Sequence, residues 1–165
     1  MQHVQNRSTT SALVLTAVLI ALATLFTMYT KIPVPGIRGY FNVGDVVIMT
    51  SALLLGRKYG AYIGAIGPAL ADLFLGYAVF VPITFVVKGI EGYLVGTVYN
   101  HKTTTSALVA TILGGIIIVA GYFIAEYFVF DPGVAIASIL TNTIQAVMSV
   151  IISMILYAIL RKRLR

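Results

Sequence analysis

The stretch SALVATILGGIIIVAGYFIAEYF, residues 106–128, decides the fold class of this chain. It is 23 residues long and contains a single charged side chain, Glu126. A helix needs about 20 consecutive apolar residues to cross the hydrocarbon core of a bilayer. We therefore expect this stretch to be a transmembrane helix.

Five more apolar runs surround this stretch, and polar residues or Pro and Gly separate them. Six helices of about 20 residues fit into a chain of 165 residues and leave no room for a soluble domain. We predict the all-α fold class: an integral membrane bundle of six transmembrane helices, forming a single transmembrane substrate-binding domain over residues 1–165. The other five predicted helices are residues 11–29, 43–55, 60–76, 82–98 and 133–160.

The composition supports a membrane protein and excludes several kinds of site. Hydrophobic residues make up 59% of the chain, charged residues 10%, and the mean hydropathy is +1.00, whereas soluble domains average about 45–50% apolar and about 25% charged residues. Cysteine is absent and both histidines, His3 and His101, lie outside the apolar runs. A phosphate-binding G-x-x-x-x-G-K-[ST] loop is also missing. We therefore expect no catalytic residues, no metal site, no cofactor and no ATP site.

The basic residues lie unevenly between the predicted helices. Eight fall on one side, and Lys31 and Arg38 fall on the other. Basic residues close to a span tend to stay in the cytoplasm, so both termini are predicted to be cytoplasmic in a multi-pass cell-membrane protein. The net charge of +6 is then an orientation signal, and no nucleic-acid partner is expected. The eight residues are Arg7, Arg57, Lys58, Lys102, Arg161, Lys162, Arg163 and Arg165.

Charged side chains inside predicted helices are costly and are functional candidates for that reason. Asp72 and Lys88 fall on antiparallel neighbours joined by a short loop, so they are expected to lie at similar depth and to pair. Glu91 follows Lys88 by three residues and shares its helix face. This cluster has two interpretations: an ion pair that holds two helices together, or contact with a polar ligand, which the unpaired third charge favours.

Three polar residues outside that cluster also have competing interpretations. Asn42 is expected to cap a helix that carries Asp45 in its first turn, where the helix dipole favours an acid. Asp45 and Asp72 are assigned to an ion pair that either stabilises the fold or holds the ligand-binding residues in position without touching the ligand. Asn142 and Gln145 are three residues apart on one helix face, and they either bind another helix or bind a polar ligand.

Two further patterns predict helix surfaces. Tyr122, Glu126 and Tyr127 are expected at the outer membrane surface, because Tyr is enriched at membrane interfaces. Small residues four positions apart let two helices approach closely. Such pairs are Ala17 and Ala21, Gly60 and Gly64, and Gly92 and Gly96, of which the glycine pairs are expected to serve internal packing.

Several short motifs follow one another in a consistent order along the chain. They are FNVGD at 41–45, the segment 52–77 with its Ala-Asp at 71–72, KGIEG at 88–92 and NTIQ at 142–145. In this order and at these membrane positions they resemble the substrate-binding S component of energy-coupling factor (ECF) vitamin transporters. The resemblance covers nearly the whole chain and is closest to the branch that carries riboflavin, pyridoxine or hydroxymethylpyrimidine.

The resemblance implies an outward-facing pocket under the first loop, lined by the fourth to sixth helices, in a prokaryotic cell membrane. It implies two kinds of partner, a transmembrane scaffold protein of the EcfT type and two ATPase subunits, with the Ala17 and Ala21 face meeting the scaffold. Tryptophan is absent, so stacking on a ring ligand is left to Tyr and Phe. The predicted substrate-binding residues are Lys88, Glu91, Asn142, Gln145, Tyr40, Phe41 and Tyr122.

The predicted function is high-affinity capture of a small heteroaromatic vitamin or vitamin precursor for an ATP-driven ECF importer. Hydroxymethylpyrimidine is preferred, because the loops are short and Trp is missing, while pyridoxine and riboflavin also suit a pocket of donors and acceptors. The main alternative is a self-sufficient secondary transporter or proton-coupled channel, in which Asp72, Lys88 and Glu91 relay protons. A further alternative is a membrane subunit with a purely structural role. An intramembrane enzyme is disfavoured because no nucleophile–base pair is present.

Overall fold

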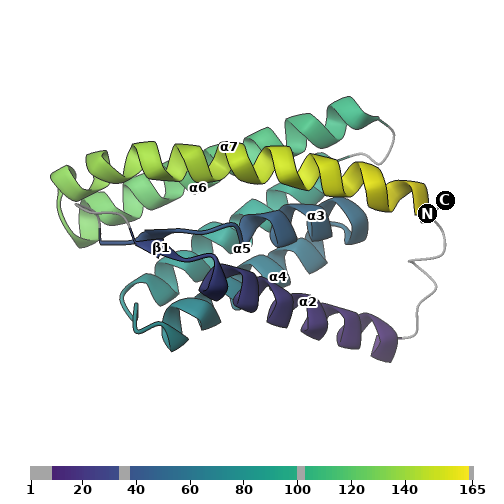
Figure 1. Cartoon of the computed structure of the whole chain (residues 1–165), viewed down its shortest axis with the longest axis horizontal. Coiled ribbons are helices and arrows are strands. Elements are labelled where there is room, and N and C mark those ends of the chain that lie inside the picture. Colours follow the sequence, from purple (N-terminus) through teal and green to yellow (C-terminus); the bar gives the residue numbers. More distant parts are fainter. Residues whose placement is uncertain (1–8, 34–37, 100–102, 164–165) are drawn as a thin grey trace.

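The computed structural model describes residues 9–33, 38–99 and 103–163, and in these it contains six α-helices and one short two-stranded ribbon. Figure 1 shows the helices running roughly along one long axis, with α6 and α7 side by side. The predicted all-α bundle of six helices is confirmed. The elements are α2 (Thr9–Tyr29), β1 (Ile32–Pro33), β2 (Tyr40–Phe41), α3 (Asp45–Leu55), α4 (Arg57–Phe74), α5 (Phe80–Val98), α6 (Thr104–Val129) and α7 (Pro132–Arg163).

Local chemistry sets the helix ends close to the predicted positions. Gly56 separates α3 from α4 with φ of +92°, a backbone conformation that side chains with a Cβ rarely adopt. The Thr103 side chain caps α6 by accepting a hydrogen bond from the Ser106 backbone N–H. Pro132 begins α7, where its missing N–H costs nothing.

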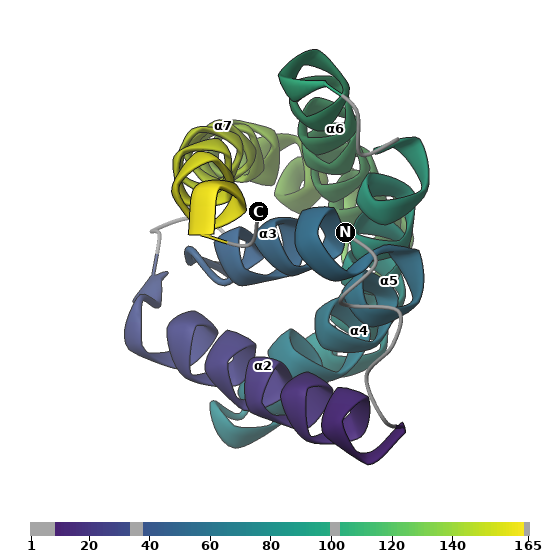
Figure 2. The ribbon, with the colours of Figure 1, turned by 90° about the vertical axis from the view of Figure 1, so that its right-hand side faces the viewer.

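The short helix α3 lies in the middle of the bundle, with the other five helices around it (Figure 2). It has 11 residues, which span about 16 Å, roughly half of a hydrocarbon core of about 30 Å. Nine of its residues, positions 45–53, are buried, as expected for a helix that is apolar on all sides. Its N-terminal residue, Asp45, is thereby placed inside the protein.

Four of the described helices, α2, α5, α6 and α7, are long and apolar enough to cross a membrane. Helix α3 is too short to do so alone, and α4 carries Arg57, Lys58 and Asp72 in its 18 residues. The bundle therefore combines four long apolar helices with two that carry much of the polar chemistry.

Glycine contacts bring α4 and α5 together, as predicted. A Cβ on Gly60 would lie 2.5 Å from the Gly92 carbonyl oxygen, and one on Gly64 would collide with the carbonyl oxygen of Lys88. Both distances are too short for real atoms, so only glycine permits this approach. The close packing fixes the backbone of Lys88 against α4.

The ribbon is a feature that the sequence did not predict, because it lies between the predicted helices 11–29 and 43–55, in a segment rich in Pro and Gly. Strand β1 pairs antiparallel with β2, with Ile32 opposite Phe41 and Pro33 opposite Tyr40. Alternate side chains of a strand point to opposite faces, so Tyr40 and Phe41 face different ways.

The first turn of α2 and the last turn of α7 lie at the same end of the bundle, away from the ribbon (Figure 1). This agrees with an even number of crossings, while the cytoplasmic placement of that end stays a prediction. Several residues named in the sequence analysis lie outside the described ranges, namely His3, Arg7, His101, Lys102 and Arg165.

Candidate functional site

Nearly all the acidic residues of the chain are buried inside the bundle. The sequence has five Asp and Glu residues, and four of them are almost inaccessible: Asp45 and Glu91 are 0% exposed, and Asp72 and Glu126 are 3% exposed. Lys88, on α5, is the buried lysine among them and is 2% exposed. A protein with net charge +6 thus has an acid-rich interior.

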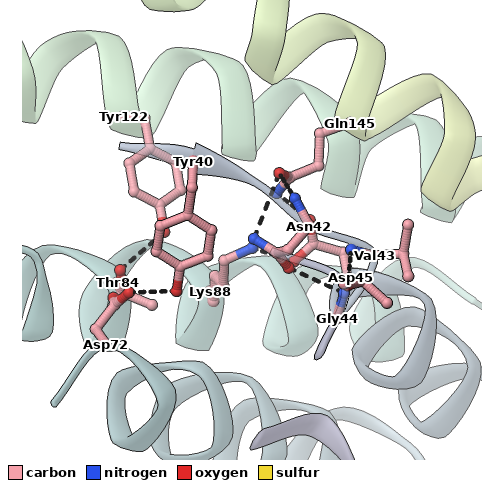
Figure 3. A network of polar contacts seen from close by, with 11 residues as sticks. Tyr40, Asn42, Val43, Gly44, Asp45, Asp72, Thr84, Lys88, Tyr122 and Gln145 are labelled. Atoms are coloured by element: carbon pink, nitrogen blue, oxygen red, sulfur yellow. Dashed lines mark hydrogen bonds and ion pairs between the residues drawn. The ribbon is translucent and has the colours of Figure 1, made fainter. Parts of the chain in front are cut away.

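Lys88 forms an ion pair with Asp45, the first residue of the central helix α3 (Figure 3). The other oxygen of this carboxylate, Oδ2, accepts a hydrogen bond of 2.7 Å from Gln145 Nε2 on α7. Both charges are therefore compensated, which a buried ion pair requires. The contact joins α3, α5 and α7 at one point.

The predicted pair between Asp72 and Lys88 is wrong, because Lys88 pairs with Asp45 instead. The central position of α3 explains the difference, since it places the Asp45 carboxylate directly against α5. Asp72, on α4, accepts a hydrogen bond of 2.6 Å at Oδ1 from the Tyr40 hydroxyl on the ribbon. Asp45 is therefore a member of the ion pair, and Asp72 is not.

Asn42 and Gln145 extend the network around Asp45. Gln145 Oε1 accepts from the Asn42 backbone N–H at 3.0 Å and from Asn42 Nδ2 at 3.4 Å. The predicted helix cap by Asn42 is wrong: its Oδ1 accepts from the Gly44 backbone N–H at 2.9 Å, and α3 has no side-chain cap. Asn42 instead closes a local turn that presents Asp45 to the interior.

A second polar group lies around Asp72. Thr84 on α5 and Tyr122 on α6 share a hydrogen bond of 2.9 Å, and Thr84 also lies beside Asp72. Burial and the nearby Asp72 carboxylate raise the pKa of the Tyr40 phenol above its usual value. Tyr40 is therefore protonated and acts as the donor to Asp72. The second oxygen of that carboxylate, Oδ2, is buried and has no hydrogen-bond partner among the described residues.

These groups surround a small cavity near the ribbon end of the bundle. The cavity has a volume of about 30 Å³, which is room for little more than a water molecule. Three buried polar atoms without partners in the described part of the chain belong to residues of its wall: Thr27 Oγ1, Asp72 Oδ2 and Asn142 Nδ2. The wall is formed by Thr27, Gly39, Tyr40, Asn42, Pro68, Asp72, Phe80, Thr84, Lys88, Tyr122, Glu126, Ser138, Asn142 and Gln145.

Most predicted substrate-binding residues meet at this cavity, but two of them do not line it. Tyr40, Lys88, Tyr122, Asn142 and Gln145 are part of the wall.

Glu91 and Phe41 lie elsewhere. Glu91 is one turn beyond Lys88 and is fully buried, with neither carboxylate oxygen bonded to a described residue. Its Cγ lies near Gly114 of α6, where a Cβ would be 3.5 Å away. Phe41 is half-buried on the opposite face of the ribbon from Tyr40.

Several wall residues were not predicted from the sequence. Glu126 was assigned to the membrane surface, but it is buried and accepts a hydrogen bond from Ser138 of α7. Its position four residues after Tyr122, on the same helix face, was a usable signal. Thr27, Thr84 and Ser138 gave no signal, because hydroxyl side chains are common in apolar helices and bond to their own backbone.

The chemical groups of the wall are of the kinds that bind small polar rings. It offers carboxylate acceptors, amide donors and acceptors, hydroxyl groups and the aromatic faces of Tyr40, Phe80 and Tyr122. An apolar enclosure with a few convergent polar groups is typical of small-molecule sites. Groups of three or more His, Cys, Asp and Glu suited to a metal ion are absent from the described residues.

The predicted docking residues Ala17 and Ala21 do not line this cavity. Both are exposed on the outer face of α2. The inner face of α2 packs on α4, where Thr24 donates a hydrogen bond of 2.9 Å to the Gly67 carbonyl oxygen. The small-residue stripe is therefore free to meet another helix.

The relatives of this chain include a protein that is named as a transporter. The thiamine precursor transporter HmpT of Lactococcus lactis subsp. cremoris is 28% identical over 148 residues, covering 89% of this chain and 83% of that protein. An uncharacterised protein of Pyrococcus woesei is 42% identical over 144 residues, covering 86% of this chain and 95% of that protein.

The fold is also found in a solved structure, that of the S component of a bacterial ECF transporter. The two structures agree with a TM-score of 0.78 and 20% sequence identity, over 96% of this chain and 99% of the other. Residues 7–162 match the family described as ECF-type riboflavin transporter, S component. This family binds and transports vitamins in membranes and is not an enzyme family. The match covers nearly the whole chain, and the protein therefore belongs to the S components of the ECF-type riboflavin transporter family.

Proposed function

We propose that this S component captures a thiamine precursor of the hydroxymethylpyrimidine type in a prokaryotic cell membrane and passes it into the cell by ATP-driven transport. The observation that carries the proposal is the cavity wall with three buried polar atoms that lack partners in the described residues. A buried polar atom without a hydrogen bond costs about 1–3 kcal/mol. A polar ligand that bonds to these atoms recovers that free energy.

The size of the cavity favours a single-ring ligand. A volume of about 30 Å³ must expand for any vitamin. The expansion is smallest for one ring and largest for the three fused rings of riboflavin. The name of the relative HmpT, a thiamine precursor transporter, points the same way. Pyridoxine, also a single ring, is the nearest alternative substrate.

The power for transport is proposed to come from partner proteins. The sequence has no phosphate-binding loop for ATP, so a scaffold protein of the EcfT type with two ATPase subunits would supply it. The exposed Ala17 and Ala21 stripe on α2 suits the close approach of a scaffold helix.

Calorimetry on the purified chain in detergent tests the capture role. We expect one hydroxymethylpyrimidine to bind per monomer without ATP, more tightly than pyridoxine or riboflavin. Failure of all three compounds to bind would contradict the proposal. Proteoliposomes that contain only this chain should show no uptake under a proton gradient, and gradient-driven uptake there would support the secondary transporter instead.

A further inference from the structure

The charges around the cavity do not balance, and the imbalance suggests what the ligand must offer. Four buried carboxyl groups stand against one buried lysine among the described residues. Lys88 compensates Asp45, and Ser138 bonds to Glu126. Glu91 is also buried without a partner in the described residues, but it does not line the cavity. Asp72 is therefore the carboxyl group of the cavity wall that is 3% exposed and has no cation bound to it among the described residues. Burial of a carboxylate without a positive or donor partner is expensive.

One of the two carboxylate oxygens of Asp72 is bonded to the phenol of Tyr40, an aromatic ring that takes the place a ring-shaped ligand would take. Its Oδ1 accepts from the Tyr40 phenol at 2.6 Å, and its Oδ2 has no partner within the described ranges. The Tyr40 ring is held by an edge contact with Tyr77, with 4.9 Å between ring centroids. The Lys31 ammonium lies 5.7 Å from the centroid of Tyr40. An aromatic ring that donates a hydrogen bond to Asp72 therefore already fits at this place.

We propose that Asp72 is the specificity-determining anchor of the site, and that it binds the edge of an amino-substituted nitrogen heterocycle in the position that the Tyr40 phenol holds in this structure. This inference rests on the proposed capture of a ring-shaped vitamin precursor and adds the functional group that is recognised. The ligand edge consists of an amino group beside a ring nitrogen.

The hydrogen bonds of this arrangement can be counted. The ligand amino group donates one bond to a carboxylate oxygen of Asp72. The second hydrogen bond joins the ring nitrogen to the other carboxylate oxygen through a single proton. Either the protonated ring nitrogen donates this proton to the carboxylate, or the protonated carboxyl group donates it to the ring nitrogen. Two parallel hydrogen bonds to one carboxylate are both stronger and more selective than one. No bond other than the Tyr40–Asp72 hydrogen bond is broken.

Tyr40 has to leave Asp72 for this to happen, and its location makes that feasible. It lies on a ribbon of two-residue strands, which is held by few backbone hydrogen bonds compared with a helix. Asp72, by contrast, lies on α4, a helix that packs against α5 through glycine contacts. The donor is therefore on the weaker element and the acceptor is on the rigid one.

The test compares two ligands on two proteins by calorimetry. The ligands are hydroxymethylpyrimidine with its ring amino group and the same compound with hydrogen in place of that group. The native chain should prefer the amino compound by about tenfold or more. In Asp72→Ala both compounds should bind weakly and within about twofold of each other, because the preference depends on Asp72.

Each alternative outcome has a distinct meaning. A native chain that binds both compounds equally, or an Asp72→Ala chain that keeps the preference, would overturn the role of Asp72 and leave the capture of a ring ligand standing. A native chain that binds neither these compounds nor pyridoxine or riboflavin would contradict the proposed function itself.

Tyr40→Phe gives a second measurement that does not depend on the folding of Asp72→Ala. This variant keeps the ring and removes the competing hydroxyl group, so both compounds should bind about fivefold more tightly. Weaker binding in Tyr40→Phe would show that the phenol contacts the ligand, and the proposed displacement would then be wrong.

Discussion

Two buried polar regions of the bundle differ in how completely their hydrogen bonds are made. Near one end, Tyr99 at the end of α5 and Tyr157 on α7 are both fully buried, and their hydroxyl groups bond to each other. Near the ribbon, Asp72, Asn142 and Thr27 each keep a buried polar atom without a partner among the described residues. The first region holds two helices together with its own groups, whereas the second keeps polar atoms that the proposed ligand would bond to.

The ion pair between Lys88 and Asp45 belongs to the first type although it lies in the second region. Asp45 bonds to both Lys88 and Gln145, so its oxygens are satisfied without a ligand. Polar groups in the same cavity wall can therefore have different roles. A polar group with a hydrogen-bond or ion-pair partner inside the protein is assigned a structural role, and one without such a partner is assigned to ligand binding.

The largest effect is expected from Lys88→Ala, which leaves Asp45 buried without its cation. Loss of one member of a buried ion pair costs roughly 3–5 kcal/mol of stability, and thermal unfolding in detergent should show it. A matched double variant, Lys88→Met with Asp45→Asn, should recover much of the loss because no charge is stranded. If Lys88→Ala keeps native stability and loses only ligand affinity, Lys88 is a ligand contact and the division into two types fails there.

Asn142→Ala should have the opposite signature. Its Nδ2 has no partner in the described part of the protein, so unfolding of the empty protein should change by less than about 1 kcal/mol. Ligand affinity should fall about five- to a hundredfold, which corresponds to about 1–3 kcal/mol for one lost hydrogen bond. Ligand affinity by calorimetry and stability by unfolding are measured on the same preparation. Reduced stability with normal affinity would place Asn142 among the structural groups.

Tyr99→Phe sharpens the comparison from the other end of the bundle. It removes one hydroxyl group and leaves that of Tyr157 buried, so the free energy of unfolding should fall by about 1 kcal/mol. Ligand affinity should stay within about twofold, because neither Tyr99 nor Tyr157 lines the cavity. A clear loss of affinity in this variant would mean that the two regions are coupled.

The smallest effect on the isolated chain is expected from Ala17→Leu combined with Ala21→Leu. Both residues are exposed on α2, so stability and ligand affinity should stay close to native. Uptake in cells and co-purification with the scaffold should fall sharply, because Leu adds bulk where a partner helix would approach. Exposed Leu13→Ala on the same helix serves as a control that removes bulk. Normal uptake by the double variant would exclude this stripe as the docking face.

The helices could be predicted almost completely from the sequence. The predicted stretch 106–128 became Thr104–Val129, and the predicted 43–55 became Asp45–Leu55. Apolar run length and the Gly and Pro residues between runs are local signals, and the bilayer fixes how long a run must be. The identity of the polar residues at the site was also largely visible, because charged and amide side chains are rare in apolar runs.

The pairing of those residues could not be predicted in the same way. Lys88 and Asp45 are 43 positions apart in the chain, and their contact depends on the central place of α3. Spacing along α4 and α5 instead suggested Asp72 as the partner of Lys88. The burial of Glu126 depends on Ser138 of α7, a contact between two helices that no local pattern encodes.

Length, hydropathy and residue types are properties of each segment alone, so a six-helix membrane bundle with a polar site and no ATP-binding loop could be read from the amino-acid sequence. The packing of the helices was needed to learn which carboxylate meets Lys88, which residues line the cavity and which polar atoms are left unbonded. Hydrogen bonds and ion pairs act over a few ångströms between side chains from different helices. Their pattern therefore exists only after the helices have packed around α3.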